Sequence, residues 1–360
     1  MLTNLANHWA AHGDAVTVLT LATEQNDAYR LHPKVSRVAL QLAQPSTSSM
    51  SAVVNNLRRG YILRQRLLQL RPDVAISFTT SANVLLACAS ILAPWVAMGS
   101  EHNWPARSTV SRTWKLLRRY VYSQLAAVTC LTPAMAAWLQ ANTGARFTPV
   151  MPNPVWPIVA GPQVLDPASI VPVDNKLLLA AGRLAKQKGF DMLIDVFVDI
   201  AQRHGDWTLV ILGEGNERAA LQEQILRRDL SGRVLLPGVA GNIVDWYRRA
   251  DLYVMSSRFE GFGNTLAEAL ACGTPAVSFD CATGPATIIR HGVDGLLAPA
   301  EDVAALRAAL DRLMSDEGLR REFAARAIEA REFFSIEAVA QQWNVVLDDL
   351  LRARRHSGQR

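Results

Sequence analysis

The segment Arg258-Phe-Glu-Gly-Phe-Gly-Asn-Thr-Leu-Ala-Glu-Ala-Leu-Ala-Cys-Gly-Thr-Pro275 is the most informative part of this chain. The apolar run before it, residues 252–256, is typical of a buried strand. A glycine-containing turn follows and leads into a helix, whose first backbone amides have no partner inside the helix. A strand, a turn and a helix N-terminus in this order predict an anion site. The amides of Gly263, Asn264 and Thr265 are the candidates to hold a phosphate.

Two carboxylates of this segment lie eight positions apart. Glu268 falls about one turn inside the expected helix, where it would repel a phosphate but accept hydrogen bonds from a ribose diol. Its apolar neighbours argue against a merely solvated carboxylate, which is the alternative interpretation. Glu260 precedes the turn and is placed to accept hydrogen bonds from a sugar. The arrangement favours a nucleotide-sugar as ligand.

The second half of the chain alternates short apolar runs with helical segments, which predicts a parallel sheet covered by helices on both faces. Ligands of such sheets bind at the carboxyl ends of the strands. Arg183, Glu214 and Glu260 each follow an expected strand end, so we expect one shared site. Arg183 and Lys188 are cations suited to offset the charge of a diphosphate. A solvated loop is the alternative, because Lys186 lies beside them.

Four stretches carry a family resemblance: the Glu260-x7-Glu268 pattern, Ala181–Phe190, Ile211–Gly215 and Ser278–Leu297. In order and spacing they resemble the retaining glycosyltransferases of family 4. The last stretch, together with Ser100-Glu-His-Asn103, is most similar to the branch that builds bacterial exopolysaccharide and lipid-linked glycans, with its amylovoran-type and N-acetylgalactosamine transferases. The resemblance is strong over residues 176–300 and weaker before residue 150.

The resemblance implies a GT-B architecture, which is an α/β fold of two doubly wound Rossmann-like domains facing a cleft. It implies four catalytic residues: His102, Arg183, Lys188 and Glu260. The implied donor-binding residues are Gly182, Gly213, Glu214, Val239, Gly261, Phe262, Gly263, Asn264, Thr265, Leu266 and Glu268. The backbone of Val239 is the candidate to contact uracil, although a plain turn is almost as good an interpretation. Retaining enzymes of this fold are thought to react on one face of the sugar, so Glu260 is not assumed to be a nucleophile.

The domain limits follow from composition and length, since 360 residues exceed one ordinary core. Seven prolines between residues 148 and 174 exclude helix and central strand, which makes this segment the interdomain linker. We expect an acceptor-side domain over 1–155, a nucleotide-sugar domain over 156–330, and over 331–360 a helix crossing back to the first domain plus a basic tail. A helix over residues 2–11 opens the chain, so the first strand and glycine-rich turn of the first domain are expected to be missing.

Charge is distributed unevenly, because residues 1–155 hold 14 Lys and Arg against five Asp and Glu. Segments 57–68 and 112–122 mix apolar and cationic residues at helical spacing, which suits the surface of an anionic membrane. An ordinary amphipathic helix with a charged outer face explains them equally well. Nucleic acid is not expected as a partner, because no nucleic-acid motif accompanies the charge.

The cysteines and the longest apolar stretch complete the sequence-based expectations. The four cysteines show no CxxC spacing and lie in apolar surroundings, which favours buried, reduced thiols in the cytoplasm. The apolar stretch over residues 84–98 contains Pro94 and is shorter than the ~20 residues of a membrane span, so it predicts a helix followed by a strand over 95–98. No Asp-x-Asp lies where a metal would meet the diphosphate, so we expect neither a metal nor another cofactor.

Together these features predict a cytoplasmic enzyme on the inner face of the plasma membrane. It would transfer a hexose or N-acetylhexosamine from a UDP-sugar to a lipid-linked or polysaccharide acceptor. Two alternatives stay open: a nucleotide-sugar epimerase or a phosphorylase on the same fold, and a catalytically inactive binding module that lacks its opening strand.

Overall fold

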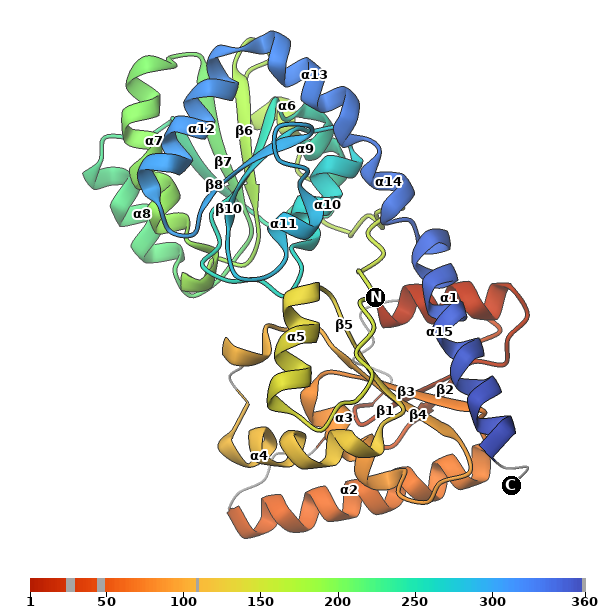
Figure 1. Ribbon diagram of the computed structural model, residues 1–360. Coiled ribbons are helices and arrows are strands. Elements are labelled where there is room, and N and C mark those ends of the chain that lie inside the picture. Colours follow the sequence, from red (N-terminus) through yellow and green to blue (C-terminus); the bar gives the residue numbers. More distant parts are fainter. Residues whose placement is uncertain (24–29, 44–48, 108–109, 358–360) are drawn as a thin grey trace. The chain divides into compact units, whose positions relative to one another are not determined.

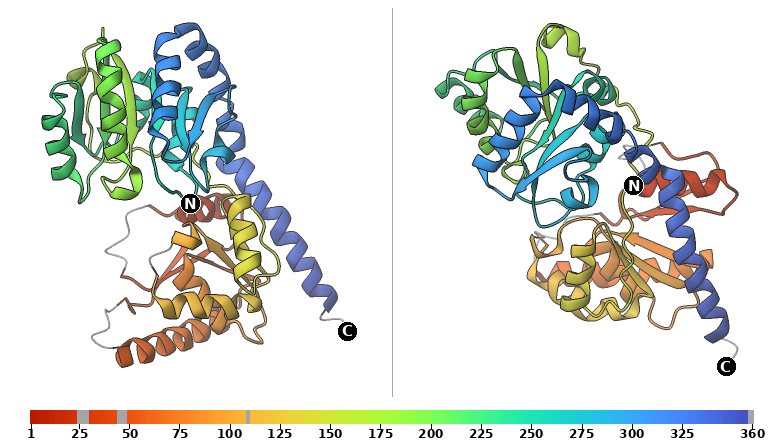
Figure 2. Two further views of the ribbon diagram at one scale, coloured as in Figure 1. Left: turned by 60° about the vertical axis from the view of Figure 1, so that its left-hand side comes forward. Right: turned by 45° about the horizontal axis from the view of Figure 1, so that its top comes forward.

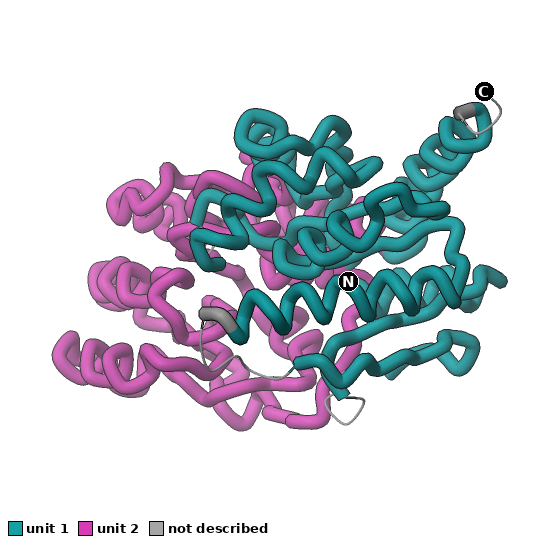
Figure 3. The backbone as a smooth tube through the Cα atoms, turned by 90° about the horizontal axis from the view of Figure 1, so that it is seen from below, with its two compact units in different colours: residues 1–154, 336–360 teal, residues 155–335 magenta. Residues whose placement is uncertain are grey.

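The computed structural model describes residues 1–23, 30–43, 49–107 and 110–357. Figure 3 shows the two compact units into which the chain divides. Unit 1 comprises residues 1–154 and 336–360, and unit 2 comprises residues 155–335. The chain therefore passes from one unit to the other twice, and the last helix belongs to unit 1.

Unit 2 is built on one sheet of six parallel strands (Figure 1). The strands are β6 (Lys176–Ala181), β7 (Trp207–Leu212), β8 (Val234–Gly238), β9 (Leu252–Met255), β10 (Ala276–Asp280) and β11 (Gly295–Pro299). Their order is β11-β10-β9-β6-β7-β8, so the direction of the winding reverses between β6 and β9. In a doubly wound sheet this reversal opens a crevice at the carboxyl ends of the two strands.

Helices cover both faces of this sheet, as Figure 1 shows. They are α6 (Pro167–Ile170), α7 (Phe190–Arg203), α8 (Arg218–Arg227), α9 (Ile243–Arg249), α10 (Asn264–Ala271), α11 (Pro285–Ile288), α12 (Val303–Ser315), α13 (Glu317–Ala327) and α14 (Ala330–Phe333). Alternate strand residues such as Leu178 and Ala180 pack against α7, α8 and α12 in one large core. The residues between them are buried as well, because helices also cover the other face, so the strands are continuous apolar runs.

The proline-rich linker contains one short helix, contrary to the sequence-based expectation. Helix α6 has Pro167 in its first turn, where the missing amide proton costs nothing, and the side chain of Asp166 caps it by accepting from the amide of Ala168.

Unit 1 contains helices α1 (Leu2–Ala11), α2 (Ser49–Leu70), α3 (Thr80–Ala89), α4 (Arg112–Val121) and α5 (Pro133–Asn142). Its strands are β1 (Thr17–Thr20), β2 (Ser36–Ala39), β3 (Val74–Phe78), β4 (Val96–Glu101) and β5 (Ala127–Cys130). They form two parallel sheets, β1-β2 and β3-β4-β5. Within the described residues no strand pairs with both β1 and β3, so the central strand that β6 provides in unit 2 has no counterpart here.

The last helix, α15 (Ile336–Ser357), is part of the core of unit 1. Trp343 is fully buried there together with Leu5 of α1 and Met98 of β4. The indole of Trp9 packs edge-on against Trp343 and donates a hydrogen bond to Asn344 at 2.9 Å. The contact with α1 and β4 anchors the C-terminal helix in this unit.

All four cysteines are unpaired, but the expectation that all are buried is wrong for two of them. Cys130 and Cys281 are buried, Cys272 is half-buried, and Cys88 is exposed on the outer face of α3. Within the described part of the chain, no helix has both the length and the apolar character that crossing a bilayer requires.

Candidate functional site

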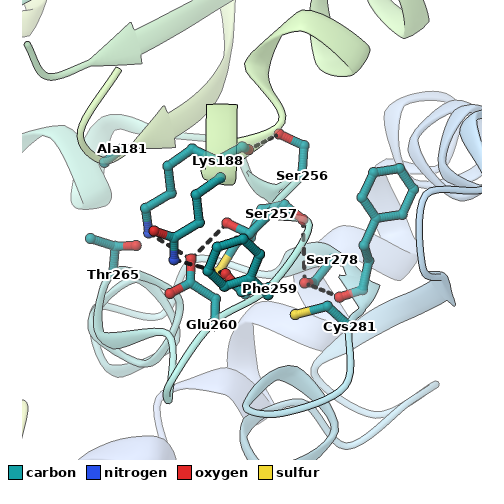
Figure 4. Close-up of polar contacts among 12 residues, drawn as sticks. Ala181, Lys188, Ser256, Ser257, Phe259, Glu260, Thr265, Ser278 and Cys281 are labelled. Atoms are coloured by element: carbon teal, nitrogen blue, oxygen red, sulfur yellow. Dashed lines mark hydrogen bonds and ion pairs between the residues drawn. The ribbon is translucent and has the colours of Figure 1, made fainter. Parts of the chain in front are cut away.

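The site of unit 2 lies where β6 and β9 end side by side, at the reversal of the sheet. The turn after β6 carries Lys188, and the turn after β9 carries Glu260. The Nζ atom of Lys188 lies 2.6 Å from Oε1 of Glu260, which Figure 4 shows in close-up. The stem of the lysine passes over Gly182, where an added Cβ would lie 3.0 Å from Cε. The structure therefore joins two residues that are 72 positions apart in the sequence.

Backbone and side-chain contacts hold these two turns together. The amide of Arg258 donates to the carbonyl of Gln187 at 2.8 Å, and the side-chain amide of Gln187 donates to the carbonyl of Phe259 at 2.8 Å. The guanidinium of Arg258 forms a bidentate pair with Asp191, at 2.8 and 2.6 Å, and holds the pKa of that carboxyl below its usual value. The relative position of Lys188 and Glu260 is thus fixed by several independent bonds.

Glu260 is nearly buried, with 7 % of its surface exposed, and its Oε1 atom has two hydrogen-bond partners. Besides Lys188, the hydroxyl of Ser257 donates to its Oε1 at 2.6 Å. The hydroxyl of Thr283 donates to its backbone carbonyl. Neither Ser257 nor Thr283 is among the site residues predicted from the sequence, because their spacing to Glu260 does not distinguish them from ordinary turn residues.

Helix α10 begins at Asn264, directly after the glycine turn, and its first amides point out of the helix N-terminus. Thr265 is half-buried there and accepts a hydrogen bond from the hydroxyl of Tyr253 at 2.8 Å. The same Tyr253 hydroxyl lies 3.4 Å from the carbonyl of Ala181, so it links the end of β6 with the start of α10. A tyrosine within an otherwise aliphatic strand run was the available signal for this residue, which sequence analysis missed.

Glu268 lies one turn inside α10 and is half-buried. Its Oε2 accepts a hydrogen bond from the hydroxyl of Tyr247 in α9 at 2.9 Å. Burial raises the pKa of the Glu268 carboxyl, and the Tyr247 hydrogen bond partly offsets that rise. The carboxylate is therefore oriented by a neighbouring helix rather than free in solvent.

Arg183 and Glu214 differ in how far their side chains are engaged. Arg183 is exposed in the turn after β6, and the structure gives it no hydrogen bond or ion pair with another described residue. Glu214 follows β7, but Arg218 grips its carboxylate with two hydrogen bonds of 2.7 and 2.6 Å. The side chain of Glu214 is thus engaged by a residue of its own segment. The backbone amide of the preceding residue, Gly213, donates to the carbonyl of Gly238 at 2.8 Å and so joins the ends of β7 and β8.

Further expected donor residues follow the ends of β8 and β9. Val239 is 45 % exposed directly after β8, two strands from the reversal. Gly261, Phe262 and Gly263 form the turn before α10, and Leu266 is buried in its first turn. The buried ring of Phe262 packs edge-on against the ring of Phe334, with 5.4 Å between the ring centres. The side chain of Phe262 therefore holds the turn against the interior of unit 2. Among the residues that the structure describes, no three His, Cys, Asp or Glu side chains converge as for a metal ion.

His102 belongs to unit 1 and directly follows β4. The strand runs to Glu101 and does not end near Met98, which corrects the sequence-based limit. Glu101 itself points into the core, where the hydroxyls of Thr80 and Tyr122 donate to it. His102 is half-buried, with Nε2 3.0 Å from Oγ of Ser100 and its ring 5.4 Å from that of Phe78.

Burial, with a smaller contribution from the terminal amino group, lowers the pKa of His102 from 6.5 to about 4. The imidazole is therefore neutral at physiological pH, so one ring nitrogen donates a hydrogen bond and the other accepts one. As the pH falls below 6.5, the unfolded chain takes up a proton before the folded chain does. The neutral ring therefore contributes fully to the free energy of unfolding above pH 6.5, and this contribution is lost as the pH falls from 6.5 toward 4.

We expect the free energy of unfolding to fall by about 2 kcal/mol through His102 between about pH 7 and about pH 5. Urea unfolding at the two pH values measures this loss. The variant His102→Gln serves as the control, because it should lose most of this part of the pH dependence. An equal pH dependence in both proteins would contradict the assignment.

Solved structures with the same architecture show which fold class this is. Sucrose-phosphate synthase from Thermosynechococcus elongatus superimposes with a TM-score of 0.81 at 20 % identity, covering 98 % of this chain and 93 % of that chain. HepE of Anabaena, solved in complex with UDP and glucose, gives a TM-score of 0.75 at 22 % identity, covering 97 % and 95 %. Two α/β units, each with parallel strands, define the GT-B fold, which is the fold predicted from the sequence.

Two family descriptions together match almost the whole chain. Residues 1–156 match "Glycosyltransferase Family 4", and residues 165–330 match "Glycosyl transferases group 1". This chain belongs to the family 4 glycosyltransferases, which confirms the resemblance seen in the sequence.

The matches to two curated relatives cover part of each relative's length. An exopolysaccharide phosphotransferase of Streptomyces coelicolor is 31 % identical over 78 % of this chain and 29 % of its own length. The amylovoran biosynthesis glycosyltransferase AmsD of Erwinia amylovora is 34 % identical over 48 % of each chain. The chain thus spans less than half the length of these two relatives.

Proposed function

We propose that this protein is a retaining glycosyltransferase of bacterial surface-glycan synthesis. It transfers a hexose or N-acetylhexosamine from a UDP-sugar to a lipid-linked or polysaccharide acceptor. The observation that carries the proposal is the meeting of Lys188, Glu260 and the N-terminus of α10 at the reversal point of the sheet. The likeness to AmsD, a glycosyltransferase of amylovoran biosynthesis, and to HepE, which was solved in complex with UDP and glucose, supports this substrate class.

The diphosphate of the donor is the group that this arrangement suits. The first amides of α10 and its helix dipole favour an anion at the helix start. Arg183 presents an exposed guanidinium that can grip two phosphate oxygens. Lys188 already contacts Glu260, so its ammonium can share its three donors between that carboxylate and a phosphate. These cations would stabilise the charge on the departing diphosphate, so we propose that no divalent metal takes part.

The two glutamates then have separate tasks. Glu268, oriented by Tyr247, would accept hydrogen bonds from the ribose diol of the nucleotide. Glu260 would accept from hydroxyls of the transferred sugar. Its Oε1 is held by Lys188 and Ser257, which supports a reaction on one face of the sugar rather than attack by a carboxylate nucleophile. His102, as a neutral ring in unit 1, would orient the acceptor or the donor sugar.

The enzyme would work at the cytoplasmic face of an anionic membrane. Its four cysteines are unpaired, as suits a reducing compartment. Residues 1–155 supply the positive charge that such a surface attracts.

The decisive assay measures UDP release and transfer of labelled sugar from a panel of UDP-sugars to a membrane extract. One donor is expected to raise the thermal stability of the protein and to be consumed only when acceptor is present. Chelation with EDTA should leave the rate unchanged. Interconversion of sugars without acceptor would instead establish an epimerase, and binding without any turnover would establish an inactive binding module.

The variant Glu268→Gln tests the ribose contact. It removes a charged acceptor of hydrogen bonds worth about 1.5–3 kcal/mol, so the KM for the donor should rise about 10- to 100-fold with a smaller change in kcat. The control is Glu223→Gln, because the side chain of Glu223 is 68 % exposed and pairs with Arg227 on the same helix. Equal donor KM values for the two variants would remove Glu268 from the site.

A further inference from the structure

An apolar stripe runs along the exposed side of α2. Val54, Leu57, Tyr61 and Leu68 are 56, 70, 65 and 38 % exposed. Their spacing of three, four and seven residues places them on one face of the helix. A helix that covered only its own domain would keep such residues on the inner face, where Leu67 is buried. The stripe therefore faces outward without a partner among the described residues of the chain.

Helix α4 repeats this pattern next to α2. Leu116 and Tyr120, one turn apart, are 57 and 65 % exposed. Both helices pack against α3, and Figures 1 and 2 show them near each other in unit 1. Two neighbouring helices thus present leucine and tyrosine side chains to the outside.

The charges on these two helices all have one sign. Neither sequence segment, 49–70 or 112–121, contains an Asp or a Glu. Arg58 on α2 and Lys115 on α4 are exposed, and the structure gives neither side chain an ion pair with another described residue. A surface that combines exposed leucine and tyrosine with unopposed cations is complementary to anionic lipid, which offers both hydrocarbon and negative charge.

We propose that α2 and α4 together form the surface by which this protein binds an anionic lipid bilayer, with the residues named above as its contacts. The helices lie in the plane of the interface, with the leucines and tyrosines among the acyl chains and the cations at the phosphate level. The proposal deepens the proposed function, on which it rests, because a lipid-linked acceptor is presented at such a surface.

Two other occupants fit the surface less well. In a symmetric dimer through α2 the same basic residues would face each other, and like charges in an interface are repulsive. A nucleic acid would match the charge, but its phosphates and grooves offer little to an aliphatic stripe such as Val54, Leu57 and Leu68. The apolar residues therefore favour an anionic bilayer over a nucleic acid as the partner of this surface.

The test is flotation of the whole protein with vesicles of phosphatidylcholine alone and of phosphatidylcholine mixed with phosphatidylglycerol. We expect binding to the mixed vesicles only. Neutralising two cations, in Arg58→Gln with Lys115→Gln, should weaken it roughly 25-fold, since each cation near the surface contributes about fivefold. Removing apolar contacts, in Leu57→Ser with Tyr61→Ser, should weaken it about tenfold or more.

Matched control variants come from unit 2. Arg227→Gln with Arg321→Gln removes two exposed cations, and Leu226→Ser removes an apolar side chain that is 59 % exposed. Both should bind vesicles as the unmodified protein does. Equal binding to neutral and anionic vesicles, or equal losses in the control variants, would overturn the proposal.

Further readouts separate the remaining outcomes. A dimer in sedimentation velocity that Leu57→Ser with Tyr61→Ser dissociates would show that a second copy covers α2. Salt-sensitive binding to an RNA duplex, without flotation, would show that the partner is nucleic acid. The donor-site variant Glu268→Gln should float normally, so a failed donor assay and a failed membrane assay are distinguishable.

Discussion

Lys188→Ala is expected to lower kcat for sugar transfer by about 100- to 1,000-fold, which is the usual effect of removing one group that stabilises charge in a transition state. The ammonium of Lys188 lies at the switch point of the sheet, 2.6 Å from Glu260 in the turn that leads into α10. A departing diphosphate at that place would lose its nearest fixed cation. Steady-state rates with a saturating donor measure the effect.

This substitution also affects stability, and the two effects have to be separated. The side chains of Lys188 and Glu260 are only 18 and 9 % exposed, so Lys188→Ala leaves a buried carboxylate that only Ser257 satisfies. Breaking such a pair costs about 3–5 kcal/mol. The double variant Lys188→Met with Glu260→Gln removes both charges, so it should recover most of the stability and still be inactive.

Lys186→Ala is the control for Lys188→Ala, because Lys186 is an exposed neighbour in the same turn. It should retain the turnover of the unmodified protein. If both single variants transferred sugar at the same rate, Lys188 would have no part in the chemistry.

Gly213→Ala is expected to destabilise unit 2 by about 3 kcal/mol or more, as a clash combined with backbone strain does elsewhere. Gly213 has φ +137°, a region that other residues avoid, and an added Cβ would lie 1.9 Å from the carbonyl oxygen of Gly182. This clash is relieved only if the turn after β6 moves. Because Arg183 follows Gly182 in that turn, donor affinity should fall as well.

Urea unfolding and the donor-induced thermal shift measure the two consequences of Gly213→Ala. Gly205→Ala is the matched control, since a Cβ there meets no atom within 4 Å. We expect Gly205→Ala to change stability by about 0.5 kcal/mol or less. Similar losses of stability in Gly213→Ala and Gly205→Ala would show that the close approach of Gly213 to Gly182 is not what makes alanine unfavourable there.

The sequence predicted the architecture of unit 2 and the meeting of its turns for a simple geometric reason. Parallel strands expose their carboxyl ends on one edge, so residues that follow successive strands must lie near each other. This reasoning brought Lys188 and Glu260 together although it contained no information on distances. The family resemblance then selected these residues from the others on the same edge.

Contacts between distant side chains could not be predicted in this way. The Tyr247 hydrogen bond to Glu268 and the link from Tyr253 to Thr265 depend on rotamers and helix rotation. Burial of single residues has the same limitation. Cys88 was expected inside because its neighbours are apolar, but it falls on the outer face of α3, where one step along the helix turns the side chain by about 100°.

The position of α15 in the core of unit 1 has a consequence for limited proteolysis. The segment around Val159 and Val164 is exposed and would be an accessible place for a protease to nick the chain. A cut there separates most of unit 1 from the sequence of unit 2, yet Trp343, on the C-terminal fragment, stays buried beside Leu5 on the N-terminal one. The two fragments should therefore copurify as a noncovalent pair, and they could be produced separately and reassembled.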